Sequence, residues 1–123
     1  MTDSKTVLTV DDSRTIRDML RMALSESGYR VVQAVDGVDG LETLQKEVPD
    51  VIITDINMPR LDGFGFIEQV RSDARFRATP ILVLTTENDP AMKDRARAAG
   101  ATGWIVKPFN PEKLAASLRR VGA

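Results

Sequence analysis

Five polar residues of types that can bind a metal ion and a phosphoryl group stand at or directly after the ends of short apolar runs. They are Asp11, Asp12, Asp55, Thr85 and Lys107. Three carboxylates brought close together repel one another, which raises their pKa values unless positive charge lies among them. Lys107 could supply a fixed ammonium group, and Mg²⁺ suits the remaining all-oxygen set. The metal and Lys107 would neutralise phosphoryl oxygens, to which Thr85 would donate a hydrogen bond.

Each of these residues also has an ordinary structural interpretation. An aspartate at a strand end is usually a turn former or a helix cap, and such a role would be sufficient for Asp55 alone. Asp11 and Asp12 could favour the N-terminus of a following helix through the helix dipole. Asp36, before Gly37, fits a cap, and we predict a structural role for it. The joint placement of the other acids, the threonine and the lysine, with a coherent charge pattern, favours function.

The elements that position these residues can be read from five apolar runs, most of them rich in β-branched residues. The runs predict strands at 6–10, 30–35, 50–54, 80–85 and 103–107. Helical patterns follow each strand, which predicts an α/β fold: a (βα)5 doubly wound, five-stranded parallel sheet of the flavodoxin-like kind. For the common strand order 2-1-3-4-5, ligands bind where the order reverses, between strands one and three. Asp11, Asp12 and Asp55 follow those two strands.

Capping residues indicate where the helices begin and end. Ser13 is expected to cap the first helix and Gly28 to end it, with Met19 on the apolar stripe that faces the core. The second helix is expected to carry an inward-facing Val48 and to end before Pro49.

Composition excludes several classes of function. The chain of 123 residues fits one domain, and its net charge of −1 gives no nucleic-acid footprint. It contains no cysteine and no histidine, which excludes disulfides, a Ser-His triad and a His-ligated zinc site within this chain. No apolar run approaches the ~18 residues of a membrane span, and no signal peptide is visible. We therefore expect a cytoplasmic location and no membrane contact.

The residues resemble a known family. The Asp11-Asp12 pair, the segment "DINMPRLDG" around Asp55, Thr85, and "KPF" from Lys107 are similar to the motifs of a response-regulator receiver domain. The resemblance covers essentially the whole chain and is close to the single-domain chemotaxis regulators of the CheY type. It implies one receiver domain over residues 1–123, with no output domain.

The resemblance implies a role for each site residue. Asp55 would be the phosphoacceptor, a carboxylate nucleophile that attacks a phosphohistidine. Asp12 and Asp55 would bind Mg²⁺ directly, Asp11 would help through water, and the backbone carbonyl of Asn57 would be a further ligand. Such a protein catalyses its own phosphotransfer and autodephosphorylation, but it is chiefly a signalling switch.

The resemblance also implies the parts of a switch. Lys107 would pair with the acids and then with the phosphoryl oxygens, and its bond to Pro108 would be cis. Thr85 would shift towards the phosphoryl group. Trp104 stands where the family usually has Tyr or Phe, and it would be the aromatic residue that follows phosphorylation. Its larger ring departs from the family pattern and puts the usual movement in question.

Partners follow from the missing histidine and from the family. The donor must be another protein, a sensor histidine kinase, unless a small phosphodonor replaces it. The flagellar motor switch or a phosphatase would bind the output face, and we expect a monomer. A phosphorelay intermediate or phosphate sink without motor binding is the alternative within the family. A flavodoxin-like FMN module and a metal-dependent phosphatase are the alternatives outside it.

Overall fold

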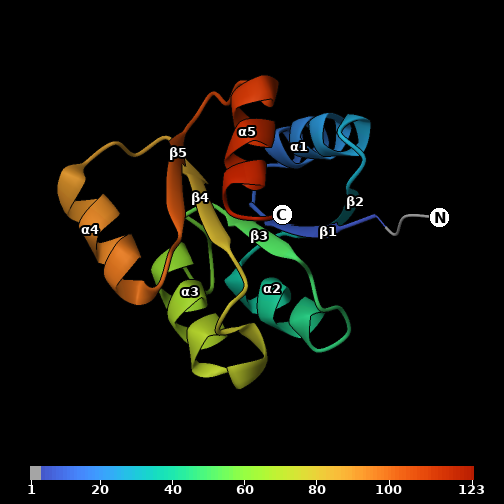
Figure 1. Cartoon of the computed structure of the whole chain (residues 1–123). Coiled ribbons are helices and arrows are strands. Elements are labelled where there is room, and N and C mark those ends of the chain that lie inside the picture. The colour runs from blue at the N-terminus through green and yellow to red at the C-terminus, as the bar shows by residue number, and fades with distance from the viewer. Residues whose placement is uncertain (1–3) are drawn as a thin grey trace.

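The computed structural model describes residues 4–123 and shows alternating strands and helices (Figure 1). The elements are β1 (Thr6–Val10), α1 (Arg14–Glu26), β2 (Arg30–Ala34), α2 (Gly37–Leu44), β3 (Val51–Thr54), α3 (Gly63–Ser72), the 3₁₀ helix η1 (Ala74–Phe76), β4 (Ile81–Thr85), α4 (Pro90–Ala99), β5 (Gly103–Val106) and α5 (Pro111–Arg120). All strand pairs are parallel, in the order β2-β1-β3-β4-β5. The predicted fold class and strand order are confirmed.

Helices cover both faces of the sheet, with α1 and α5 on one face and α2, α3 and α4 on the other (Figure 1). Successive strand residues point to opposite faces, so they divide between two cores. Val7 and Ile53 pack with the helices α1 and α5, whereas Leu8 and Ile52 pack with α2, α3 and α4. Burial on both faces explains why the central strands β1, β3 and β4 are almost continuously apolar.

The helices begin at the expected caps, but two details of the helices differ from the prediction. The Ser13 hydroxyl accepts a hydrogen bond from the Ile16 amide and caps α1. Met19 is 45% exposed rather than inward, because it lies at the edge of the apolar stripe of α1. The second helix ends at Leu44, and Val48 is 66% exposed, because a tight turn after the helix directs the chain towards β3.

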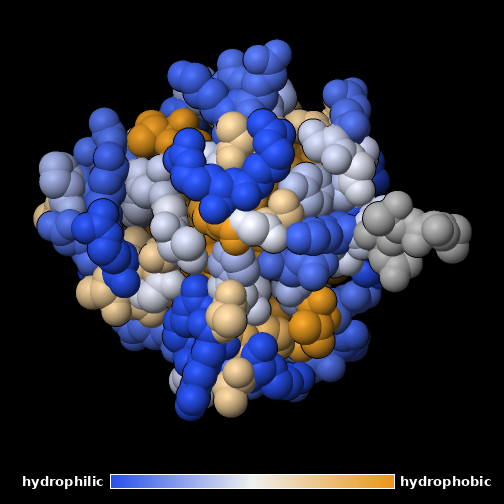
Figure 2. All heavy atoms as spheres, in the orientation of Figure 1, coloured by the Kyte–Doolittle hydropathy of each residue, from blue (hydrophilic) through white to orange (hydrophobic). Residues whose placement is uncertain are grey.

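The surface is largely hydrophilic on the side in view, including the region over α4 (Figure 2). In α4 only Ala96 is buried, and the neighbouring Arg95 and Arg97 are exposed. Within residues 4–123, no helix has the length and apolarity that crossing a membrane requires.

Candidate functional site

The backbone brings the ends of β1 and β3 side by side. The Asp55 amide donates a hydrogen bond to the Val10 carbonyl at 2.9 Å, and the Asp11 amide donates to the Ala34 carbonyl at 3.1 Å. These bonds continue the ladder of the sheet one residue beyond each strand. The aspartates that follow β1 and β3 therefore emerge at the same edge, where the strand order reverses.

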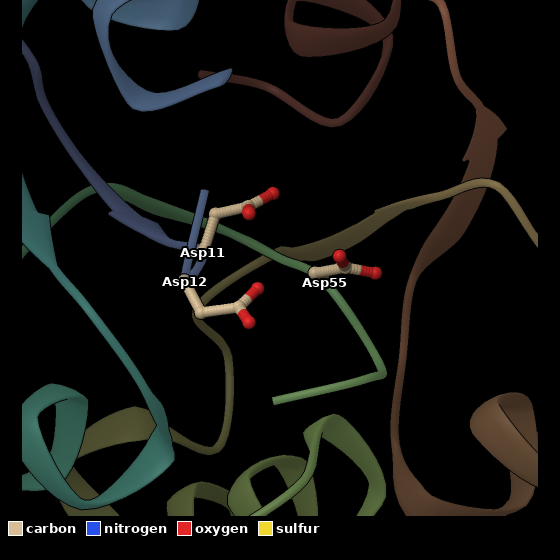
Figure 3. A group of neighbouring side chains, drawn as sticks. All are labelled: Asp11, Asp12 and Asp55. Atoms are coloured by element: carbon tan, nitrogen blue, oxygen red, sulfur yellow. The ribbon is translucent and has the colours of Figure 1, made fainter. Parts of the chain in front are cut away.

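Three carboxylates meet at this edge. One oxygen from each of Asp11, Asp12 and Asp55 lies within 4.8 Å of the others. Figure 3 shows Asp11 and Asp12 projecting from the end of β1 towards the side on which Asp55 leaves β3. Asp11 and Asp55 are buried, at 3% and 8% exposed, whereas Asp12 is exposed. The cluster thus has two buried carboxylates and one that is exposed to solvent.

Lys107 joins the two buried carboxylates. Its Nζ donates to Asp11 Oδ2 and to Asp55 Oδ2, both at 2.9 Å. The remaining oxygens accept backbone bonds: Asp11 Oδ1 from the Ser13 amide at 2.9 Å, and Asp55 Oδ1 from the Ile56 amide at 2.6 Å. The side chain of Asp12 has no hydrogen-bond partner among residues 4–123. The Lys107–Pro108 bond is cis, as the resemblance implied.

The pKa values of Asp11 and Lys107 reflect both burial and the ion pair that joins them. Burial raises the pKa of Asp11; hydrogen bonds from Lys107 and the Ser13 amide lower it, but the net direction is upward. Burial lowers the pKa of Lys107, but its hydrogen bonds to Asp11 and Asp55 outweigh the burial and raise it. The pKa of Asp11 is raised although the acid has an ion-pair partner, because burial outweighs the hydrogen bonds that it accepts; the charge of the neighbouring Asp55 adds only a small upward contribution.

The charge and the donor types of this cluster fit a divalent cation. The three carboxylates and Lys107 carry a net charge of −2 when all are ionised. Asp12 offers unpaired oxygens, and all candidate ligands are oxygens, which is the set that Mg²⁺ prefers. Carboxylates this close together repel one another unless positive charge lies among them, so the net charge favours a bound cation. A hard dication would compensate this net charge.

The predicted switch residues lie on the adjacent strands. Thr85 ends β4, is fully buried, and its Oγ1 accepts from the Glu87 amide at 3.3 Å. Trp104, on the edge strand β5, donates from Nε1 to the Glu87 carbonyl at 3.1 Å. Asn57 Nδ2 reaches Glu87 Oε1 at 3.3 Å. The loop from β4 to α4 is therefore bonded to both the loop that follows Asp55 and the indole of Trp104.

Two features of the site were not recognised from the sequence. A Cβ atom on Gly63 would collide with the Asp55 carbonyl oxygen and would lie 2.7 Å from the Ile56 Cα, so only glycine lets α3 begin against the backbone of Asp55. Asp36 caps α2 as predicted, but it also forms a bidentate ion pair with Arg60. The Asp62–Gly63 pair in the sequence was a possible signal for the close packing at Gly63. The local sequence contains no signal for the ion pair between Asp36 and Arg60.

Comparison with known proteins identifies the family. Residues 7–119 match the response regulator receiver domain, so the chain belongs to this family of two-component systems. Receiver domains take phosphoryl groups from histidine kinases and generally bind Mg²⁺ at an acidic site. Within the family, the chain is similar to the single-domain chemotaxis regulators of the CheY type.

The similarity to individual proteins extends over nearly the whole chain. Chemotaxis protein CheY1 of Helicobacter pylori is 42% identical over 117 residues, with 94% of each chain covered. The structure of chemotaxis protein CheY4 of Vibrio cholerae has a TM-score of 0.93 and 50% identity, covering 97% of this chain and 99% of that one. The receiver domain of a Pseudomonas aeruginosa sensor histidine kinase, with a magnesium ion coordinated in its active site cleft, has a TM-score of 0.90 and 26% identity, covering 98% and 100%. Other relatives are longer: the chain spans 44% and 48% of two probable transcriptional regulators.

Proposed function

We propose that this protein is a phosphorylation-activated response regulator of a chemotaxis-type two-component pathway, with Asp55 as its phosphoacceptor. The observation that carries the proposal is the arrangement of Asp55: a buried carboxylate with Lys107 on one oxygen and the open carboxylate of Asp12 beside it. The similarity to CheY1 and CheY4, both chemotaxis proteins, supports the pathway.

In the proposed reaction, a carboxylate oxygen of Asp55 attacks the phosphorus of a phosphohistidine. The oxygen–phosphorus bond forms while the nitrogen–phosphorus bond breaks, and the electron pair of that bond leaves with the imidazole. The chain contains no histidine, so the donor is a histidine of another protein, a sensor histidine kinase. Lys107, already bonded to Asp55, is placed to neutralise a phosphoryl oxygen.

Mg²⁺ is the proposed cofactor. Asp12 and Asp55 would bind it directly, with the backbone carbonyl of Asn57, while Asp11 would act through water and would hold Lys107. When bound, the ion supplies charge neutralisation for the acids and the phosphoryl oxygens. The net negative charge of the cluster and the magnesium-containing relative support this assignment.

The proposed output runs from Thr85 to Trp104 through the β4–α4 loop. A phosphoryl group that recruits the Thr85 hydroxyl would compete with the Glu87 amide for it. Because Glu87 also bonds the Trp104 indole, that change would reach the surface of β5. The flagellar motor switch or a phosphatase is the proposed reader. A phosphate sink, the alternative, would bind a motor-switch peptide equally poorly with and without phosphorylation.

Phosphoryl labelling tests the proposal. The wild-type chain is incubated with MgCl₂ and radiolabelled phosphoramidate, a small phosphodonor, beside Asp55→Asn and Asp62→Asn. Asp62 is an exposed helix cap whose role asparagine can retain, so Asp62→Asn is the matched control. We expect label on the wild type and the control, and none on Asp55→Asn. Equal labelling of Asp55→Asn would overturn the assignment.

A further inference from the structure

Arg60 has an unusual backbone conformation in the loop that follows Asp55. Its φ is +66°, the only positive φ of a non-glycine residue among residues 4–123. The Leu61 amide donates to the Pro59 carbonyl at 2.7 Å, so the chain reverses around Arg60 within three residues. For arginine, which does not favour positive φ, such a conformation costs free energy, so contacts with neighbouring residues must hold it.

Arg60 forms an ion pair with a buried carboxylate, that of Asp36. Its Nε donates to Asp36 Oδ2 at 2.7 Å and its Nη2 donates to Asp36 Oδ1 at 3.0 Å. The Asp36 side chain is only 5% exposed, and Oδ1 also accepts from the Asp39 amide at 2.8 Å at the start of α2. Charge-assisted bidentate pairs of this kind fix orientation as well as distance. Arg60 is therefore bonded to a buried carboxylate that is itself bonded to the start of α2.

This ion pair is one of two side-chain tethers on the loop. For residues 57–61, the hydrogen bonds from side chains to other described elements are Arg60 to Asp36, and Asn57 to Glu87. The second is a single bond of 3.3 Å between an exposed amide and a carboxylate, so it is the weaker one. The Leu61 carbonyl oxygen also packs against Gly37, where an added Cβ would lie 2.6 Å from it. The loop is thus held mainly from the α2 side.

We propose that Arg60 is a positioning residue for the metal site. Its pair with Asp36 holds the β3–α3 loop in one conformation, so that the backbone carbonyl of Asn57, three residues earlier, is kept in place for Mg²⁺. This inference rests on the proposed function, because it assigns Arg60 to the metal that Asp12 and Asp55 would bind. Arg60 acts through the loop and does not itself touch the metal.

Charge alone makes a different prediction, which allows a sharp test. If Arg60 and Asp36 acted only through long-range electrostatics, removing the cation would tighten Mg²⁺ binding and removing the anion would weaken it. If the ion pair holds the loop in place, either substitution breaks the pair and weakens Mg²⁺ binding, and the double substitution weakens binding no further.

The test is an MgCl₂ titration of the unphosphorylated, ¹⁵N-labelled chain, followed by amide chemical shifts. The variants are Arg60→Asn, which tolerates positive φ, Asp36→Asn, which keeps the helix cap, and their combination. Arg75→Asn is the matched control, since it removes a similar bidentate pair with Asp73. That pair lies beside η1, which precedes β4, and so at the end of the strands opposite to the three aspartates. We expect Kd for Mg²⁺ to rise about tenfold in Arg60→Asn, in Asp36→Asn and in their combination, and to stay unchanged in the control. A tenfold rise is the lower end of the range for residues that orient metal ligands without touching the metal.

Several results would overturn the inference. Unchanged affinity in both single variants would exclude positioning, and tighter binding in Arg60→Asn with weaker binding in Asp36→Asn would reduce the pair to its charges. A wild-type chain that binds no Mg²⁺ would overturn the metal site of the proposed function as well. If Arg60→Asn does not fold, Arg60→Gly takes its place, because glycine adopts positive φ freely. Faster hydrogen exchange of the Leu61 amide in the variants is the second expected readout.

Discussion

Replacing Lys107 by methionine should destabilise the fold through charge. Methionine retains most of the aliphatic stem but removes the ammonium that Asp11 and Asp55 share. The side chains of all three residues are at most 10% exposed. Removing one partner of a buried ion pair typically costs about 3–5 kcal/mol, because the other charge is left uncompensated. We take about 3 kcal/mol here, since water reaches the site beside Asp12.

This cost has a pH dependence whose sign can be worked out. Without the ammonium, burial raises the pKa of Asp11 further above its ordinary value. A carboxyl whose pKa is higher in the folded state destabilises the fold while it is ionised, and the penalty fades as the pH falls through the folded pKa. The deficit of Lys107→Met is therefore expected to shrink as the pH is lowered from 7 into acid. The raised pKa of Lys107 in the wild type means that its contribution is complete below its ordinary pKa and is lost only in alkali.

Thermal unfolding followed by circular dichroism measures the effect. A loss of about 3 kcal/mol corresponds to a fall of about 10 °C in Tm for a domain of this size. Lys113→Met, at an exposed position on α5, is the matched control and should change stability by less than about 0.5 kcal/mol. Adding Asp11→Asn to Lys107→Met should restore most of the loss. A deficit that does not shrink as the pH is lowered, and that Asp11→Asn does not repair, would refute the electrostatic reasoning.

Three further predictions concern the frame around the site. Gly63→Ala should cost at least about 2 kcal/mol in urea denaturation through backbone overlap, whereas Gly28→Ala, with φ +91° but no atom within 4 Å, should cost only about 1 kcal/mol. Asp36→Asn should lower Tm at pH 7, and the difference from the wild type should shrink in acid, because the lowered pKa of Asp36 gives a stabilisation that is lost as the pH falls through the folded pKa. A difference that persists in acid would contradict this. Trp104→Phe should cost about 1 kcal/mol in urea denaturation by removing the bond to the Glu87 carbonyl; unchanged stability would argue that this bond is weak.

Much of the fold followed from local patterns. Apolar runs of five or six residues predicted every strand to within one residue at each end. In the central strands β1, β3 and β4 the pattern is clear because burial on both faces leaves few polar positions. The helix end at Leu44 was not predicted, since the apolar Val48 continues the helical spacing. The exposure of Val48 depends on how the chain turns into β3, which the tertiary structure determines.

The sequence by itself determined which chemical groups lie at the carboxyl ends of the strands, where the candidate site is. Asp11, Asp12, Asp55, Thr85 and Lys107 each stand at a strand end, and parallel strands bring those ends together. The apolar pattern locates each strand and the parallel arrangement gives its direction. The sequence therefore predicts that the residues at the strand ends lie together at one end of the sheet.

Only the tertiary structure decided how those groups are held. Asp36 and Arg60 are 24 residues apart and meet only because α2 and the β3–α3 loop pack against each other. The left-handed turn at Arg60 likewise has no signature in residue type, since arginine does not favour positive φ. Such contacts depend on the relative placement of whole elements, which packing fixes and local pattern does not.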